Sequence, residues 1–216
     1  MRTDTEHLLI PGAAGPIDTL VEAPEKPLGI ALVGHPHPLF GGANTNKVAQ
    51  TLARTFVGLG YAALRPNFRG VGQSAGSHDE GRGETEDMLT VLDYARQRFG
   101  DLPVVLGGFS FGAYVQARVA KHLADEGRPV QRLVLIGTAS GFVEGTRHYE
   151  TDAVPADTIV IHGSADTTVP LANVLAWAEP LELPVVVVPG ADHFFHRRLH
   201  ILRNIIQSNW HPQDRP

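Results

Sequence analysis

The feature that most constrains the fold is a repeated alternation of short apolar runs and amphipathic stretches. The runs are rich in Val, Ile and Leu, as in strands that are buried on both faces, and they cover residues 28–34, 61–66, 102–108, 131–137, 157–163 and 183–190. The intervening stretches predict helices over 46–60, 84–100, 111–127, 171–181 and 196–210. Residues 7–12 and 15–23 predict a hairpin-like pair of strands ahead of this pattern. Together they predict an α/β fold with a mainly parallel sheet and helices on both faces.

Composition narrows the classes of protein that fit this pattern. The 216 residues contain no internal repeat and no long linker, so we expect a single domain over 1–216. The net charge is −5 and no run of Lys or Arg occurs, which argues against a nucleic-acid or anionic-membrane partner. The absence of cysteine excludes disulfides and fits a reducing cytoplasm. No signal-peptide pattern and no apolar run near the roughly 18 residues of a membrane span is present, so we expect a cytoplasmic protein.

Two Gly-x-Ser-x-Gly motifs compete for the role of a nucleophile, GQSAG at 72–76 and GFSFG at 108–112. A nucleophilic serine of this type needs a sharp turn between a buried strand and a helix that begins at once. Ser110 follows the apolar run 102–108 and precedes a strong helix pattern. Ser74 is followed by GSHDEGRG, which cannot form a helix. The context therefore favours Ser110.

A serine hydroxyl is a weak nucleophile, so it needs a base and a carboxylate that orients the base. Asp166 follows the apolar run 157–163, and His193 follows the last run. Since the carboxyl ends of parallel strands share one edge of a sheet, we expect Ser110, Asp166 and His193 to lie together. An alternative is that Asp166 caps the helix that begins near Pro170.

Other acids and histidines are weaker candidates. Asp152 and Asp157 do not follow a predicted strand. Asp192 is adjacent to His193 and therefore poorly placed to orient its ring, so we assign Asp192 to a turn. His196 and His200 lie within the last predicted helix, away from the loop edge.

The three loops resemble those of the α/β-hydrolase superfamily. GFSFG resembles its nucleophile elbow, HGSADTTVP its acid loop and GADHFF its histidine loop, and the resemblance extends from about Leu28 to the last helix. The stretch HPHP, followed by GG and NKV, is similar to that of a group of small bacterial hydrolases. The resemblance implies an α/β-hydrolase fold and a catalytic Ser110–Asp166–His193 triad.

The resemblance also implies an oxyanion hole made of two backbone N–H groups. The first is that of Phe111, directly after the nucleophile. The second comes from the loop after the third strand, where the superfamily alignment selects His37 and leaves Leu39 as a second choice. Pro36 and Pro38 have no N–H to donate.

The interval between the sixth strand and the acid strand, where relatives insert a lid, covers only 138–156. We therefore expect no substantial cap domain and an open pocket. Five phenylalanines are candidates to line this pocket or, equally, to pack in the core: Phe40, Phe111, Phe142, Phe194 and Phe195. A pocket of this kind predicts short or medium acyl esters, or thioesters, as small-molecule substrates.

Two other functions stay open, a small peptidase or amidase and a non-catalytic binding module. A metal site at His35 and His37 is conceivable but lacks a carboxylate cluster. No nucleotide-phosphate loop is present, so no cofactor and no metal is expected, and the protein is expected to be a monomer or small homo-oligomer.

The motif around Ser74 has a structural interpretation as well. NFRGVGQSAG resembles the superfamily loop Asp-x-Arg-Gly-x-Gly-x-Ser that follows the fourth strand, with Asn67 in place of the usual Asp. Arg69 and Gly70 are then expected to anchor the loop, and Ser74 to stabilise its turn.

Overall fold

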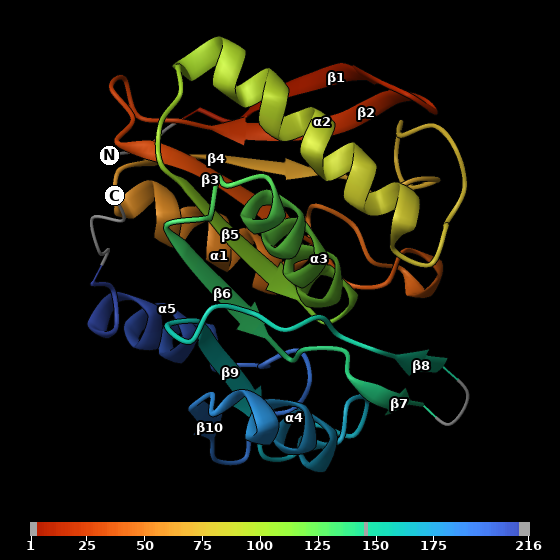
Figure 1. Cartoon of the computed structure of the whole chain (residues 1–216), viewed down its shortest axis with the longest axis vertical. Coiled ribbons are helices and arrows are strands. Elements are labelled where there is room, and N and C mark those ends of the chain that lie inside the picture. The colour runs from red at the N-terminus through yellow and green to blue at the C-terminus, as the bar shows by residue number, and fades with distance from the viewer. Residues whose placement is uncertain (1–3, 145–146, 212–216) are drawn as a thin grey trace.

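The computed structural model describes residues 4–144 and 147–211. Eight strands form one sheet in the order β1-β2-β4-β3-β5-β6-β9-β10 (Figure 1). Their bounds are Glu6–Gly12 (β1), Gly15–Glu22 (β2), Gly29–Gly34 (β3), Tyr61–Pro66 (β4), Val104–Phe109 (β5), Arg132–Ile136 (β6), Ile159–Gly163 (β9) and Val185–Val188 (β10). β1 and β2 pair antiparallel, and β2 joins β4 antiparallel. All other pairings are parallel, so the predicted hairpin and mainly parallel sheet are confirmed.

Helices cover both faces of the sheet, as predicted. One face carries α1 (Lys47–Gly58) and α5 (Leu199–Ser208), which pack against each other and bury residues such as Leu52 and Leu202. The other carries α2 (Arg82–Phe99), α3 (Phe111–Asp125) and α4 (Leu171–Ala178). Figure 1 shows α2 and α3 side by side over the strands. None of the helices in the described residues is both long and apolar enough to cross a membrane.

The C-terminal prediction is wrong at one boundary. α5 begins at Leu199 rather than at residue 196, so His196 lies in the preceding turn and not within the helix. The backbone explains the late start, because Phe195 and Arg197 both have positive φ, which a helix does not allow. Asp192 accepts hydrogen bonds from the backbone N–H and the ring of His196, so the assignment of Asp192 to a turn is confirmed.

The interval between β6 and β9 contains no helical cap within its described residues. It contains two short paired strands, β7 (Gly141–Val143) and β8 (Arg147–Tyr149), which sequence patterns did not predict. Two 3-10 turns complete the elements, η1 (Pro38–Phe40) and η2 (Glu179–Leu181).

The centre of the sheet positions the turn after β5. β5 is buried along its whole length between β3 and β6, and α3 begins one residue after Ser110. The start of α3 lies against the end of β3, where a Cβ atom on Gly112 would be 2.4 Å from the carbonyl carbon of Gly34. Only glycine permits this approach, which brings the first turn of α3 to the edge of the sheet.

A buried histidine holds the loop that follows β3. The Nδ1 atom of His35 lies 2.6 Å from the carbonyl oxygen of Pro36, and the backbone N–H of Phe68 donates to Nε2 at 2.8 Å. This pair of contacts requires a neutral imidazole, with the proton on Nδ1. Burial lowers the pKa of His35 to about 3.

We expect this histidine to destabilise the protein in mild acid. The unfolded chain binds a proton below about pH 6.5 while folded His35 stays neutral, so stability is present above that pH and is lost as pH falls. Between pH 7 and pH 5 the loss from His35 is about 2 kcal/mol. Urea unfolding at both pH values measures it. His35→Gln is expected to reduce the pH difference, and the control His200→Gln, at an exposed position, to preserve it. An equal pH difference in wild type and His35→Gln would contradict the assignment.

Candidate active site

Ser110 occupies a strained position between β5 and α3. Its φ is 57° and its ψ is −119°, which is unusual for a residue other than glycine. Its backbone N–H donates to the carbonyl oxygen of Ile136 at 2.9 Å, and its carbonyl oxygen accepts from the N–H of Ala113 at 2.9 Å. The turn is therefore held from β6 and from α3, and this conformation is the strand–turn–helix that the motif predicts.

The structure brings the three predicted side chains together. His193 lies on the loop after β10, with Nε2 3.0 Å from Ser110 Oγ and Nδ1 2.7 Å from Asp166 Oδ2. With the carboxylate facing Nδ1, the neutral ring donates its Nδ1–H to Asp166. Its Nε2 is then free to accept the hydroxyl proton of Ser110. A proton on Ser110 Oγ therefore has a direct path to a base.

Asp166 is held by its own loop rather than by a helix. Its Oδ1 accepts the backbone N–H groups of Thr168 at 2.9 Å and Val169 at 2.8 Å, and its side chain is fully buried. α4 begins after Pro170 without a side-chain cap, so the alternative role of Asp166 as the cap of this helix is wrong. Both N–H groups and the His193 ring orient the carboxylate.

A second histidine beneath Asp166 was missed by sequence reasoning. His162, in β9, is fully buried, with Nε2 3.0 Å from the carbonyl oxygen of Val169 and 3.5 Å from Asp166 Oδ2. Burial lowers the pKa of His162, so a neutral ring lies against the carboxylate. The apolar run IVIHG offered no signal for this contact, because a histidine there is indistinguishable from a core residue.

The loop after β3 lies beside Ser110 and presents His37. The backbone N–H of Leu39 donates to His37 Nδ1 at 3.3 Å, so this N–H is already engaged, which disfavours the second-choice donor. The His37 ring packs against Phe111 with 4.9 Å between ring centroids. Burial, together with the electrostatic influence of neighbouring His78 and Arg147, lowers the pKa of His37 to about 4.

A cavity of about 210 Å³ opens at Ser110 and His193. Ten other residues line it: Pro36, His37, Phe40, Gly41, Gly42, Asn46, Glu144, Arg147, Thr168 and Phe194. Two of the five candidate phenylalanines, Phe40 and Phe194, therefore face the site. Phe111 and Phe195 are buried in the core, and Phe142 is exposed on β7. The cavity is small, and it combines aromatic surface with a charged rim.

The chain resembles known proteins along its whole length. A family model described as alpha/beta hydrolase fold matches residues 36–152. The solved structure of XC6422 from Xanthomonas campestris, called an a/b serine hydrolase without lid, is 36% identical with a TM-score of 0.81, covering 100% of this chain and 99% of that one. The uncharacterized protein RP471 of Rickettsia prowazekii is 31% identical over 84% of this chain and 81% of its own.

The chain belongs to the alpha/beta hydrolase family. Membership supports hydrolase activity on a small molecule. A chicken relative of this alpha/beta hydrolase, lysophosphatidylserine lipase ABHD12, is 32% identical over 54% of this chain but only 32% of its own length. Its match is thus confined to a part of both proteins.

The GQSAG loop of this alpha/beta hydrolase has the predicted structural contacts. Ser74 Oγ donates to the carbonyl oxygen of Asn67 at 2.8 Å and accepts the backbone N–H of Asp18 at 3.0 Å. Arg69 pairs with Asp87 of α2 at 2.9 Å, which anchors the loop. The carboxylate next to Asn67 is that of Asp18, whose Oδ2 lies 3.0 Å from Asn67 Nδ2.

A metal site on the HPHP loop has no support in this alpha/beta hydrolase. Both ring nitrogens of His35 are already within hydrogen-bonding distance of backbone atoms. Across residues 4–144 and 147–211, no group of three or more His, Cys, Asp or Glu side chains could hold a metal ion.

Proposed function

We propose that this protein is a serine hydrolase that cleaves small carboxylic esters or thioesters through an acyl-enzyme. The observation that supports it most is the continuous hydrogen-bonded chain from Ser110 Oγ through His193 to Asp166 at a strained strand–helix turn. Each member comes from a different loop at the same edge of the sheet.

The proposed mechanism follows from this arrangement. Ser110 Oγ attacks the acyl carbon while His193 Nε2 takes its proton, and Asp166 stabilises the resulting imidazolium. The backbone N–H groups of Phe111, the first residue of α3, and His37 stabilise the developing oxyanion. His193 then returns the proton to the leaving alcohol or thiol. Water, deprotonated by His193, releases the acid and restores Ser110.

The size of the cavity supports short or medium acyl groups. About 210 Å³ lies at Ser110, and Phe40 and Phe194 provide apolar surface for a few carbons. No helical cap covers the site in the described residues, so a long chain would stay in contact with water. The name of the chicken relative, a lipase, supports an ester as the bond that is cleaved.

The two alternatives are less well supported. A binding module has no need of a base that lies 3.0 Å from a serine hydroxyl on one side and 2.7 Å from a carboxylate on the other. A small peptidase or amidase is less well supported because the described residues that line the Ser110 cavity include one carboxylate, that of Glu144, and no carboxylate pair that could bind a peptide amine. We further propose, from the cysteine-free composition, that the protein acts in the cytoplasm. Its expected state stays a monomer or small homo-oligomer.

Substrate hydrolysis tests this proposal directly. We expect kcat/KM for p-nitrophenyl esters to peak between acetyl and octanoyl and to fall for palmitoyl, because the cavity accommodates only the shorter chains. The matched p-nitroanilides are expected to react at least about a hundredfold more slowly, since the leaving amine is poorer. Faster cleavage of the anilides would favour the amidase alternative, and hydrolysis of neither series would contradict the proposal.

A further inference from the structure

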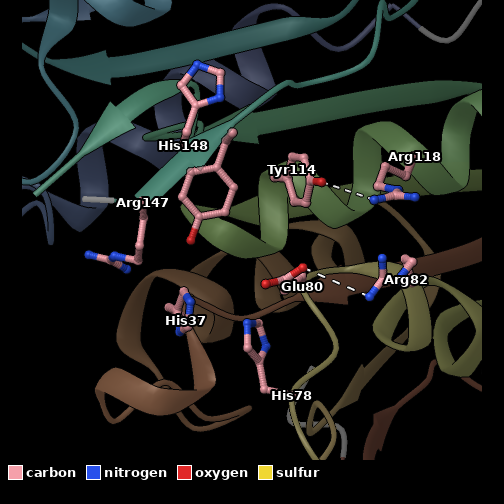
Figure 2. A pocket seen from close by; sticks show the side chains of 9 residues that line it. His37, His78, Glu80, Arg82, Tyr114, Arg118, Arg147 and His148 are labelled. Atoms are coloured by element: carbon pink, nitrogen blue, oxygen red, sulfur yellow. Dashed lines mark hydrogen bonds and ion pairs between the residues drawn. The ribbon is translucent and has the colours of Figure 1, made fainter. Parts of the chain in front are cut away.

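A second and larger cavity adjoins the one at Ser110. Its volume is about 520 Å³, and it shares His37 and Arg147 with the Ser110 cavity. Figure 2 shows its walls, with Tyr114 and Arg118 from α3, Arg147 and His148 from β8, and the loop before α2 on the opposite side. A molecule bound at Ser110 could therefore extend past His37 and Arg147 into this space.

The walls of this cavity are rich in cations and hydrogen-bond donors. Three arginines line it, Arg82, Arg118 and Arg147, against a single carboxylate among its lining residues, that of Glu80. His37 adds an N–H donor, because its Nδ1 accepts the Leu39 N–H and its ring proton is therefore on Nε2. Guanidinium groups bind carboxylate and phosphate oxygens with two parallel hydrogen bonds, so this lining favours an anion.

The three arginines differ in whether a carboxylate of the protein already pairs with them. Arg82 pairs with Asp79 at 3.1 Å, and Arg147 pairs with Glu144. Arg118 donates to the Tyr114 hydroxyl at 3.0 Å, and in the described part of the chain it has no carboxylate partner. Its remaining N–H groups are available to a ligand, which makes Arg118 the strongest candidate for an anion contact.

The cavity is also built on a rigid base. The buried carboxylate of Glu84 accepts the backbone N–H groups of Asp79 and Gly81 and lies 2.9 Å from His78 Nδ1, which holds the loop 78–82 in place. Tyr114 packs on Gly81, where a Cβ atom would lie 2.6 Å from the tyrosine ring. A site whose walls are already ordered loses little entropy when a ligand binds.

We propose that this second cavity binds a carboxylate or phosphate group of the ester substrate. Arg118 is then the main residue in contact with the anion, and Arg147 lies between the two cavities. This inference rests on the proposed function, because it assigns a charged part to the molecule that Ser110 attacks. It predicts that the preferred substrates are anionic esters rather than neutral ones.

Matched ester pairs test the inference. One pair places a carboxylate on the acyl side, p-nitrophenyl glutarate against p-nitrophenyl valerate. The other places a phosphate on the alcohol side, acetylglycerol 3-phosphate against monoacetylglycerol. We expect wild type to favour the anionic member of at least one pair in kcat/KM by at least about tenfold, mainly through KM. The pair that shows the effect identifies the anion and the side of the ester that bears it.

Substitutions of Arg118 test whether this cavity causes the preference for anionic esters. Arg118→Met is expected to reduce the anionic-to-neutral ratio by at least about tenfold, and Arg118→Lys by less, since it keeps the charge. The control Arg203→Met removes an exposed arginine of α5, on the other face of the sheet, and is expected to keep the wild-type ratio. Equal unfolding temperatures establish that the variants are folded. A wild-type ratio near one, or a ratio that survives in Arg118→Met, would overturn the inference.

Calorimetric titration of Ser110→Ala with inorganic phosphate separates this inference from the proposed function, because it needs no catalysis. Phosphate binding that an added Arg118→Met substitution weakens at least about tenfold supports the anion site even if no ester is cleaved. Equal kcat/KM values for neutral and anionic esters would contradict the anion site alone. The serine-hydrolase proposal would then still hold.

Discussion

Replacing Ser110 with Ala is expected to abolish labelling by a fluorophosphonate probe and to lower kcat/KM for a short acyl ester about a million-fold. The reason is that the variant lacks the hydroxyl that lies 3.0 Å from Nε2 of the His193 ring. In-gel fluorescence of the labelled protein and a p-nitrophenyl butyrate assay measure the two effects. Wild type that resists the probe would contradict the whole serine-hydrolase proposal.

Ser74→Ala is the matched control, since Ser74 stands in the competing Gly-x-Ser-x-Gly motif. Its hydroxyl is engaged by Asn67 and by the backbone N–H of Asp18. We expect full labelling with a loss of about 1–2 kcal/mol in stability, the usual cost of a lost buried hydrogen bond. Labelling that persists in Ser110→Ala but disappears in Ser74→Ala would reverse the choice of serine.

Asp166→Asn is expected to lower kcat about ten-thousand-fold while KM stays within a fewfold. The side-chain oxygen of Asn can still accept the N–H groups of Thr168 and Val169. Its NH₂ group then faces His193 Nδ1 and forces the ring proton onto Nε2, where the ring cannot accept a proton from Ser110. Steady-state kinetics on the same ester measures the effect, and thermal unfolding verifies the fold.

Asp192→Asn provides the control for that experiment. Asp192 is the neighbour of His193 in sequence, yet its carboxylate contacts His196. We expect a rate within a fewfold of wild type. A large loss of rate in Asp192→Asn together with a small loss in Asp166→Asn would show that the catalytic acid is Asp192 and not Asp166.

Most of the sheet and the three loops could be predicted because their signals are local. The buried strands appear as unbroken Val, Ile and Leu runs, and the elbow appears as glycines around Ser110 between a strand and a helix. Asp166 and His193 could be found because parallel strands bring their loops to one edge. The start of α5 could not be predicted from the sequence, because the positive φ angles of Phe195 and Arg197 have no reliable sequence signal.

The β7–β8 pair and the second cavity were beyond prediction for a different reason. β7 and β8 are three residues each, too short for a periodic pattern. The cavity joins Arg118 on α3, Arg147 on β8 and the loop held by Glu84, which are distant in sequence and meet only when α2 and α3 pack on the sheet.

The sequence by itself determined the class of fold, the elbow serine and the two loops that meet it, because apolar periodicity and a glycine-rich turn are local properties of the chain. Only the tertiary structure decided the rest. It placed His162 under Asp166, engaged the Leu39 N–H with His37, and left Arg118 without a carboxylate among the described residues. These outcomes depend on distances between side chains of separate elements, which are set when helices and loops pack around the sheet.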